Sequence, residues 1–205
     1  MNISFNFYSL FNIISKKEYF SYSLYAVAGS LGYLFVYKLD ALMIPNLISY
    51  EANGVYSIAT IAAGVIYIPA RGIILIFAPE ISELLKKEKF QDLNVIYKNI
   101  AKTLVFVGLL IFGILLVGIQ DFFSLLPSSN ELNQTISVIY IIGTTTIINM
   151  AAGLNSQIII YSKFYKFNIS ALLFLAFFNV INNYLFIAVF NFGIEGAALA
   201  SLMSI

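Results

Sequence analysis

Apolar residues fill the chain in long runs that short polar segments separate. A helix that crosses a bilayer needs about 20 consecutive, mainly apolar residues. Five runs reach that length, and a sixth opens at Gly193 and stops with the sequence at Ile205. We therefore predict an all-α fold, a polytopic bundle of transmembrane helices with five full spans and a truncated sixth. The expected spans are residues 19–47, 55–78, 103–126, 136–161 and 169–190, followed by the short run 193–205.

The composition agrees with a membrane protein and excludes several other classes. Hydrophobic residues make up 60% of the chain and charged residues 10%, whereas a soluble domain carries about 25% charged residues. Cysteine and histidine are absent, which removes disulfides and the commonest metal ligands and general base. The net charge of +1 gives no reason to expect a nucleic-acid partner. Because no nucleophile motif or phosphate loop is present either, we expect no enzyme, no cofactor and no metal.

Basic residues occupy alternate loops. The loops after the first, third and fifth spans contain no lysine or arginine, and the other polar segments hold Lys16, Lys17, Lys86, Lys87, Lys89, Lys98, Lys102, Lys163 and Lys166. Loops rich in lysine stay on the cytoplasmic side of a membrane. We therefore expect residues 1–18 to be a cytoplasmic linker and residues 19–205 to form one transmembrane lobe of a multi-pass protein.

The second predicted span ends in a change from apolar to charged residues. Pro79 disfavours helix at the residue before it, so we expect the span to end there. Residues 82–101 then combine apolar positions at helical spacing with a charged opposite face. This pattern predicts an amphipathic helix along the cytoplasmic interface, with an ordinary solvated connector as the alternative.

Polar residues also lie inside the predicted spans. An ionised group in hydrocarbon costs about 2.5–3.5 kcal/mol on insertion scales, so such side chains face protein or a water-filled cavity. Arg71 lies well inside the second span, where it either lines a cavity for an anionic ligand, forms an internal ion pair or snorkels to the interface. Pro69, two residues earlier, predicts a kink or hinge beside it. The other candidates for a substrate cavity are Lys38, Asp40, Asn149, Gln157, Asn179, Asn182 and Asn183.

Each of these candidates has a simpler interpretation. Amide and hydroxyl side chains hold membrane helices together at about 0.6 kcal/mol per hydrogen bond on average. The asparagines and the threonines of the fourth span fit that role. Lys38, near the outer end of the first span, fits a lysine that snorkels to the interface.

Several short motifs follow one another in a characteristic order. Asp40 precedes an apolar stretch and then Gly54, Val55 and Tyr56. Pro79 stands within Ala-Pro-Glu-Ile-Ser, and an asparagine-rich span leads into Gly-Ile-Glu-Gly-Ala-Ala from Gly193. In this order the motifs resemble bacterial polysaccharide biosynthesis membrane proteins. These are flippases of lipid-linked oligosaccharides in the multidrug/oligosaccharidyl-lipid/polysaccharide exporter superfamily.

The resemblance implies a fold of two six-helix lobes around a central cavity, of which this chain is similar to the second. Its partners would be the missing first lobe, the bilayer and an undecaprenyl-diphosphate-linked oligosaccharide. The implied function is to flip that lipid across the bacterial inner membrane, by alternating access coupled to protons or sodium, for polysaccharide or lipopolysaccharide O-antigen biosynthesis. A drug/cation antiporter of the same superfamily is one alternative. A membrane-embedded polysaccharide polymerase or glycosyltransferase is another.

The alternation of lysines makes a prediction about topology. A reporter fused after Lys87 should read cytoplasmic, and one fused after Asn130 should read periplasmic, because lysine-rich loops stay inside. Enzymatic reporters active on only one side of the membrane measure this directly. The reverse pattern, or the same side for both fusions, would contradict the five-span assignment.

Overall fold

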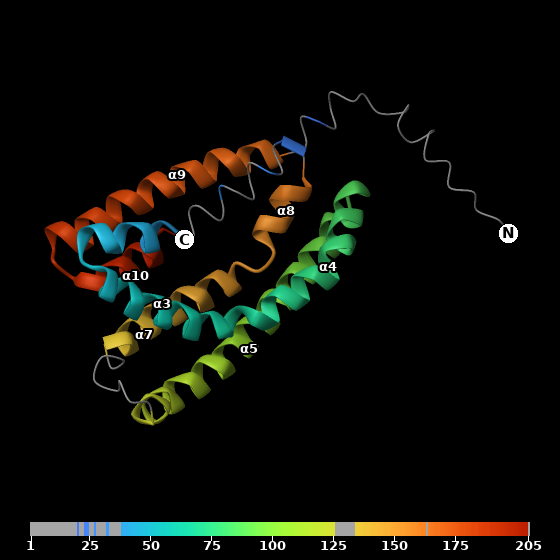
Figure 1. Ribbon diagram of the computed structural model, residues 1–205. Coiled ribbons are helices and arrows are strands. Elements are labelled where there is room, and N and C mark those ends of the chain that lie inside the picture. Colours follow the sequence, from blue (N-terminus) through green and yellow to red (C-terminus); the bar gives the residue numbers. More distant parts are fainter. Residues whose placement is uncertain are drawn as a thin grey trace, which may run out of the picture.

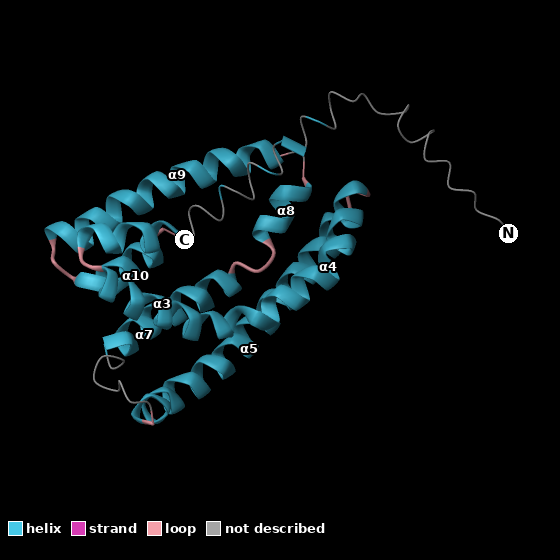
Figure 2. Ribbon diagram, viewed as in Figure 1, coloured by secondary structure: helices cyan, strands magenta, loops and turns pink. Residues whose placement is uncertain are grey.

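The structure of the chain, a computed structural model, describes residues 38–125, 134–162 and 164–204, together with the isolated residues 20, 23, 24, 27 and 32. These residues form helices joined by short turns, and none of them is in a strand (Figure 2). After a helix at 38–47 the elements are α3 (Tyr50–Gly64), the 3₁₀ segment η1 (Val65–Tyr67), α4 (Ile68–Lys86), α5 (Phe90–Ser124), α7 (Gln134–Ala151), α8 (Asn155–Tyr161), α9 (Tyr165–Tyr184), the π-helical segment η2 (Leu185–Val189) and α10 (Gly193–Met203).

The described residues confirm an all-helical chain of the multi-pass membrane type. Four helical stretches are long and apolar enough to cross a bilayer, namely Tyr50–Lys86, Phe90–Ser124, Gln134–Ala151 and Phe167–Val189. The predicted total of five spans and a truncated sixth is not confirmed. The linker 1–18 and most of the first span, 19–47, lie outside the described residues. Helix α10 has 11 residues and so reaches only about 16 Å, well short of a bilayer core.

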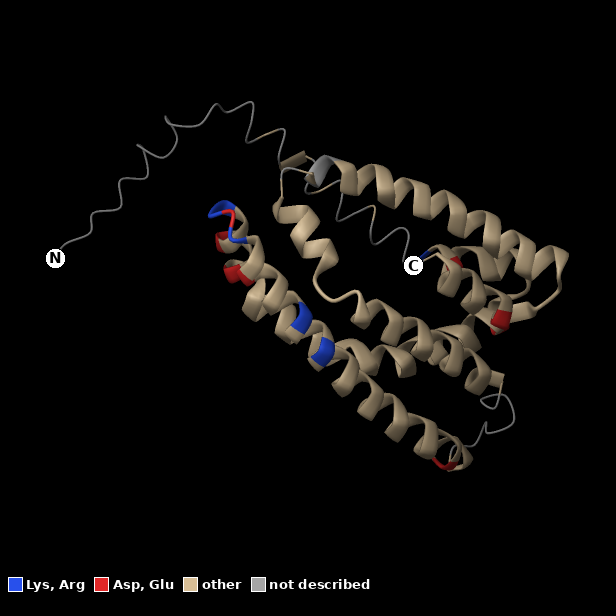
Figure 3. Cartoon of the chain, turned by 180° about the vertical axis from the view of Figure 1, so that it is seen from behind, with Lys and Arg blue, Asp and Glu red and all other residues tan. Residues whose placement is uncertain are grey.

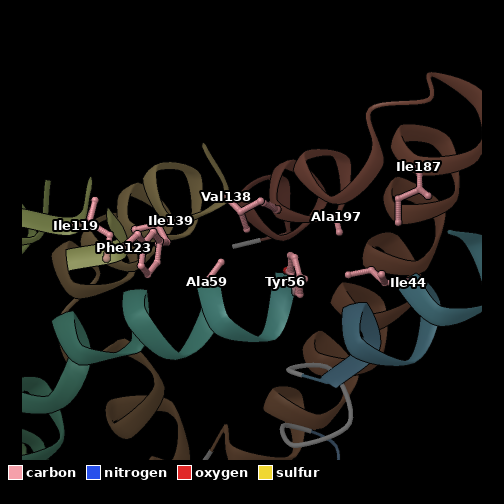
Figure 4. Close-up of a cluster of buried hydrophobic side chains, with 10 residues drawn as sticks. Ile44, Tyr56, Ala59, Ile119, Phe123, Val138, Ile139, Ile187 and Ala197 are labelled. Carbon is pink, nitrogen blue, oxygen red and sulfur yellow. The ribbon is translucent and has the colours of Figure 1, made fainter. Parts of the chain in front are cut away.

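Helix α7 organises the packing, because it contacts α3, α5 and α10. Two hydrophobic clusters lie along it. The first surrounds Ala59 of α3, Val138 of α7 and Ala197 of α10 (Figure 4). The second surrounds Ile81 of α4, Leu104 of α5 and Met150 of α7. Helices α4 and α5 form a long hairpin, and α9 lies with α10 on the other side of the α3–α7 pair (Figure 1).

The second predicted span is longer than the sequence indicated. Helix α4 continues past Pro79 to Lys86 instead of ending before the proline. Proline removes one backbone hydrogen bond from a helix interior. The apolar face of α4 nevertheless extends on both sides of Pro79, from Phe77 through Ile81 to Leu84, and packs into the second cluster. Burial of that face outweighs the local cost, so the helix continues through Pro79, and the end of the membrane span there stays a prediction.

The amphipathic helix predicted at residues 82–101 is not a separate element. A turn at Lys87–Lys89 divides this segment, so its first part closes α4 and its second part opens α5. Glu88 adopts a positive φ of 54° in that turn. The apolar residues Leu93 and Ile100 are buried in the second cluster. The spacing is therefore that of a packed helix face, shared between the end of α4 and the start of α5.

The fourth predicted span, 136–161, is also interrupted. Helix α7 ends at Ala151, and α8 begins at Asn155 after a turn. Gly153 takes a φ of +60° in this turn, a conformation that residues with a side chain rarely adopt. Helix α8 then turns away to contact α4 and α9 (Figure 1). The apolar run is long enough for one span, but the chain folds it as two helices.

Gly196 marks a close backbone approach between α10 and η2. A Cβ atom at this position would lie 2.9 Å from the carbonyl oxygen of Phe186. We expect Gly196→Ala to lower the free energy of unfolding by about 1–3 kcal/mol, the usual cost of overpacking. Thermal unfolding of the detergent-purified protein measures this. In the control Gly118→Ala the added Cβ meets nothing within 4 Å, and equal melting temperatures for the two variants would contradict the close approach.

Candidate functional site

The candidate site begins with the hairpin between the helix at 38–47 and α3. Ile48 and Ser49 form the turn, and the Ser49 side chain caps α3 by accepting a hydrogen bond from the Ala52 amide at 3.1 Å. Asp40 and Tyr56 each lie eight residues from Ile48, on opposite sides of the turn. The two helices therefore bring them to the same level, where both are buried.

The carboxyl group of Asp40 is the centre of a buried hydrogen-bond cluster. Its side chain is only 7% exposed. Oδ2 accepts a hydrogen bond from the Tyr56 hydroxyl at 2.7 Å and another from the Ser201 hydroxyl. Oδ1 accepts one from the Asn183 amide at 2.8 Å. Three donors from α3, α9 and α10 thus converge on one carboxyl group from the helix at 38–47.

Two asparagines one turn apart on α9 extend this cluster. The Asn183 amide nitrogen donates also to the side-chain oxygen of Asn179 at 2.9 Å and to its carbonyl oxygen at 3.1 Å. Asn179 in turn donates to the Ser204 hydroxyl at 3.4 Å. The Asn183 side-chain oxygen is buried without a partner among the described residues. Because buried polar groups are usually hydrogen-bonded, this oxygen keeps an unused acceptor beside Asp40.

Irregular backbone places Ser201 opposite Asp40. Helix α9 continues as the π-helical segment η2. The chain then reverses direction at Asn191 and Gly193, whose φ angles are 56° and 58°. The amide of Phe192 then donates to the carbonyl oxygen of Phe186 at 2.9 Å. This reversal returns α10 against η2 and α9. Single π-helical turns within α-helices occur frequently at functional sites.

Arg71 lies apart from the Asp40 cluster, on the exposed side of α4. Its guanidinium carbon stands 5.9 Å from the centre of the Tyr67 ring, which is within cation–π range. No described carboxylate forms an ion pair with it. Pro69 lies in the first turn of α4, directly after the 3₁₀ segment η1. The 3₁₀ turn thus precedes Arg71 by one helical turn within the helical stretch Tyr50–Lys86, and the kink at Pro69 stays a prediction.

The remaining predicted site residues are scattered. Lys38 is exposed although Asp40, two residues on, is buried; Asn149 is exposed and Gln157 half-buried. Asn182 is buried, and its amide nitrogen has no partner among the described residues. Thr145 and Thr146 donate to the carbonyl oxygens of Ile141 and Ile142 in their own helix, at 2.8 Å each. These two hydroxyls therefore do not hold neighbouring helices together through those bonds.

Three members of the cluster were missed as site residues from the sequence. Tyr56 was noted only within a family motif, Ser201 only as a small packing residue, and Ser204 not at all. One signal could have found Tyr56, since it and Asp40 each lie eight residues from Ile48, in the turn that Ser49 signals. No comparable signal locates Ser201, because α10 is placed by contacts with distant segments of the chain.

The chain was also compared with known proteins. No family model, no curated protein and no solved structure matches it. Among the described residues, no group of three or more aspartate, glutamate, cysteine or histidine side chains could hold a metal ion. The chemistry of the site therefore follows from its geometry, which is one carboxyl group, three hydroxyl groups and two carboxamides in an apolar bundle.

The cluster predicts an order of stabilities. Asp40→Ala removes the acceptor of three hydrogen bonds, those from Tyr56, Ser201 and Asn183, and each bond lost costs about 0.5–1.5 kcal/mol. Ser201→Ala removes only one of three donors and should cost less, with Asp40→Asn between the two. We expect the unfolding temperatures of the detergent-purified variants to follow that order. The control Lys38→Ala alters an exposed side chain, and an Asp40→Ala variant as stable as this control would contradict the cluster.

Proposed function

We propose that this chain is one lobe of a transporter that flips a lipid-linked oligosaccharide, carried on undecaprenyl diphosphate, across the bacterial inner membrane. In this proposal the chain resembles the second lobe of polysaccharide exporters, and the N-terminus is cytoplasmic. A first lobe completes the cavity, and the two lobes alternate between inward-open and outward-open states. The product serves surface polysaccharide or O-antigen biosynthesis.

The exposed position of Arg71 carries this proposal. The apolar stretch around it is long enough to span a membrane, and a cation facing lipid there would be costly. The described chain supplies no carboxylate for it, and in this proposal a water-filled cavity covers this face of α4. An arginine presents several N–H donors in a planar fork, which matches the oxygens of a diphosphate. The interrupted helix at η1 and Pro69 fits the broken helices that line transporter cavities.

The Asp40 cluster supplies a site for the coupling ion in the same proposal. Among the described residues Asp40 has no cationic partner, and such a carboxyl group can bind a proton or a sodium ion inside a bundle. The unpartnered side-chain oxygen of Asn183 belongs to the amide that donates to Asp40, so a cation would find a second oxygen there. Binding at this point changes the hydrogen bonds among four helical segments. That link offers a physical route from ion binding to movement of the lobe.

The same cluster favours one second candidate, a drug/cation antiporter of the same superfamily. A buried carboxyl group without a cationic partner is the arrangement that a cationic substrate needs. In that case Asp40 would bind the exported compound and Arg71 would hold another part of the protein. The two candidates thus differ in the role of Arg71: the flippase needs it to bind substrate, and the antiporter does not.

The proposal predicts how the protein with Arg71 altered behaves in its host. We expect Arg71→Ala to reduce surface polysaccharide at least about tenfold, because charge-assisted hydrogen bonds to the substrate are lost. Arg71→Lys should keep part of the activity, since a lysine replaces the charge but not the fork. The control Lys86→Ala removes a cation near the end of the same helix. Polysaccharide staining and membrane abundance are measured together.

Two outcomes would contradict the flippase. Normal polysaccharide in Arg71→Ala cells would reject the role of Arg71. Export of a cationic dye that Asp40→Asn abolishes, with polysaccharide unchanged in both variants, would favour the antiporter. Loss of the Arg71→Ala protein from the membrane would assign Arg71 to the internal structure instead.

A further inference from the structure

A groove lies on the flank of α5 where α7 ends. Five of its lining residues belong to α5, and Ala151 closes it from the last turn of α7; the α5 residues are Ala101, Lys102, Val105, Phe106 and Leu109. Its volume is about 440 Å³. The turn at Gly153 directs α8 toward α4 and α9, so no other described helix covers this side of α5.

Lys102 is the one charged residue among those that line the groove, and the other lining residues are apolar. Lys98 lies outside the lining but is exposed one turn before Lys102 on α5, so the two lysines share a face. Neither forms an ion pair with another described residue, in contrast to Lys87 and Lys89 at the hairpin tip, which lie within ion-pair distance of Glu83 and Asp92. Below the lysines the lining is apolar, and the Phe106 ring is 64% exposed. In Figure 3 the charged residues gather at and below the tip of the α4–α5 hairpin, and most of the other helical surface is uncharged.

The length of α5 sets the depth of this groove in the membrane. The helix has 35 residues and is therefore about 52 Å long, whereas a bilayer core is about 30 Å thick. Its uninterrupted apolar stretch begins at Thr103, directly after Lys102. If this apolar stretch fills the bilayer core, the two lysines fall at the level of the lipid headgroups and Val105, Phe106 and Leu109 at the level of the acyl chains.

We propose that this groove binds one anionic phospholipid of the surrounding leaflet. Its phosphate lies between Lys98 and Lys102, and one acyl chain follows Val105, Phe106 and Leu109. The charge of the lysines complements the phosphate, and the apolar floor complements the chain. This inference requires only that the chain crosses a membrane, so it stands whether or not the transported substrate is a lipid-linked oligosaccharide.

A tryptophan reporter tests the site. The chain contains no tryptophan, so Phe106→Trp places a single reporter in the groove and Val117→Trp a control on the same helix, at a residue 81% exposed. Each purified full chain is reconstituted into phosphatidylcholine vesicles with brominated phosphatidylglycerol or brominated phosphatidylcholine at equal mole fraction. We expect the anionic lipid to quench preferentially at position 106, by roughly fivefold for each lysine, and equally at position 117.

Matched variants separate the groove from general attraction to charge. Lys98→Gln with Lys102→Gln should abolish the preference at position 106, whereas Lys86→Gln with Lys87→Gln removes the same charge at the hairpin tip and should leave it. Equal quenching at positions 106 and 117, or a preference that survives loss of the groove lysines, would overturn the proposal. If that double variant does not insert, salt provides the test. At 1 M the screening length falls to about 3 Å, and a preference unchanged there would also overturn it.

Discussion

A carboxyl group inside an apolar bundle must be hydrogen-bonded, and Asp40 imposes this requirement on the helices around it. Its three donors come from α3, α9 and α10, which lie up to 161 residues away in the sequence. Breaking such a network leaves several buried groups unpaired at once, so it specifies one arrangement of the helices far more strongly than apolar contacts do. The small residues Ala197, Ala198 and Ala200 of α10 then allow the close packing that brings Ser201 to the carboxyl group.

The helices are interrupted close to the polar residues that matter most. The 3₁₀ segment η1 precedes Arg71, and the π-helical segment η2 follows Asn183 by two residues. An interrupted ladder of backbone hydrogen bonds lets a helix change direction, and in a membrane its free groups need partners within the protein. Phe186 illustrates this, since its carbonyl oxygen accepts from the amide of Phe192. The irregular segments thus serve both to shape the site and to permit bending, which the proposed alternating access requires.

Asp40 and Arg71, which both lie in predicted spans, do not form an ion pair with each other. Asp40 is buried among uncharged donors, and Arg71 is exposed on α4 without a described carboxylate. A charge pair within the bundle would neutralise both and leave neither free to bind a ligand. Their separation therefore supports two roles: the carboxyl group of Asp40 is available to a cation, and the guanidinium group of Arg71 is available to an anion. It argues against the interpretation of Arg71 as half of an internal ion pair within the described chain.

The sequence by itself determined that the chain is helical and of membrane type, because long apolar runs with few charges are stable as helices in a bilayer and not in water. It also identified Asp40, Asn179 and Asn183, since polar residues are conspicuous in apolar runs. Only the tertiary structure decided that Tyr56 and Ser201 meet Asp40 and that Arg71 does not, because helical periodicity describes one helix and not its neighbours. The continuation of α4 past Pro79 and the break at Gly153 were likewise decided by packing. There the burial of whole helix faces, not the preference of one residue, determines where a helix ends.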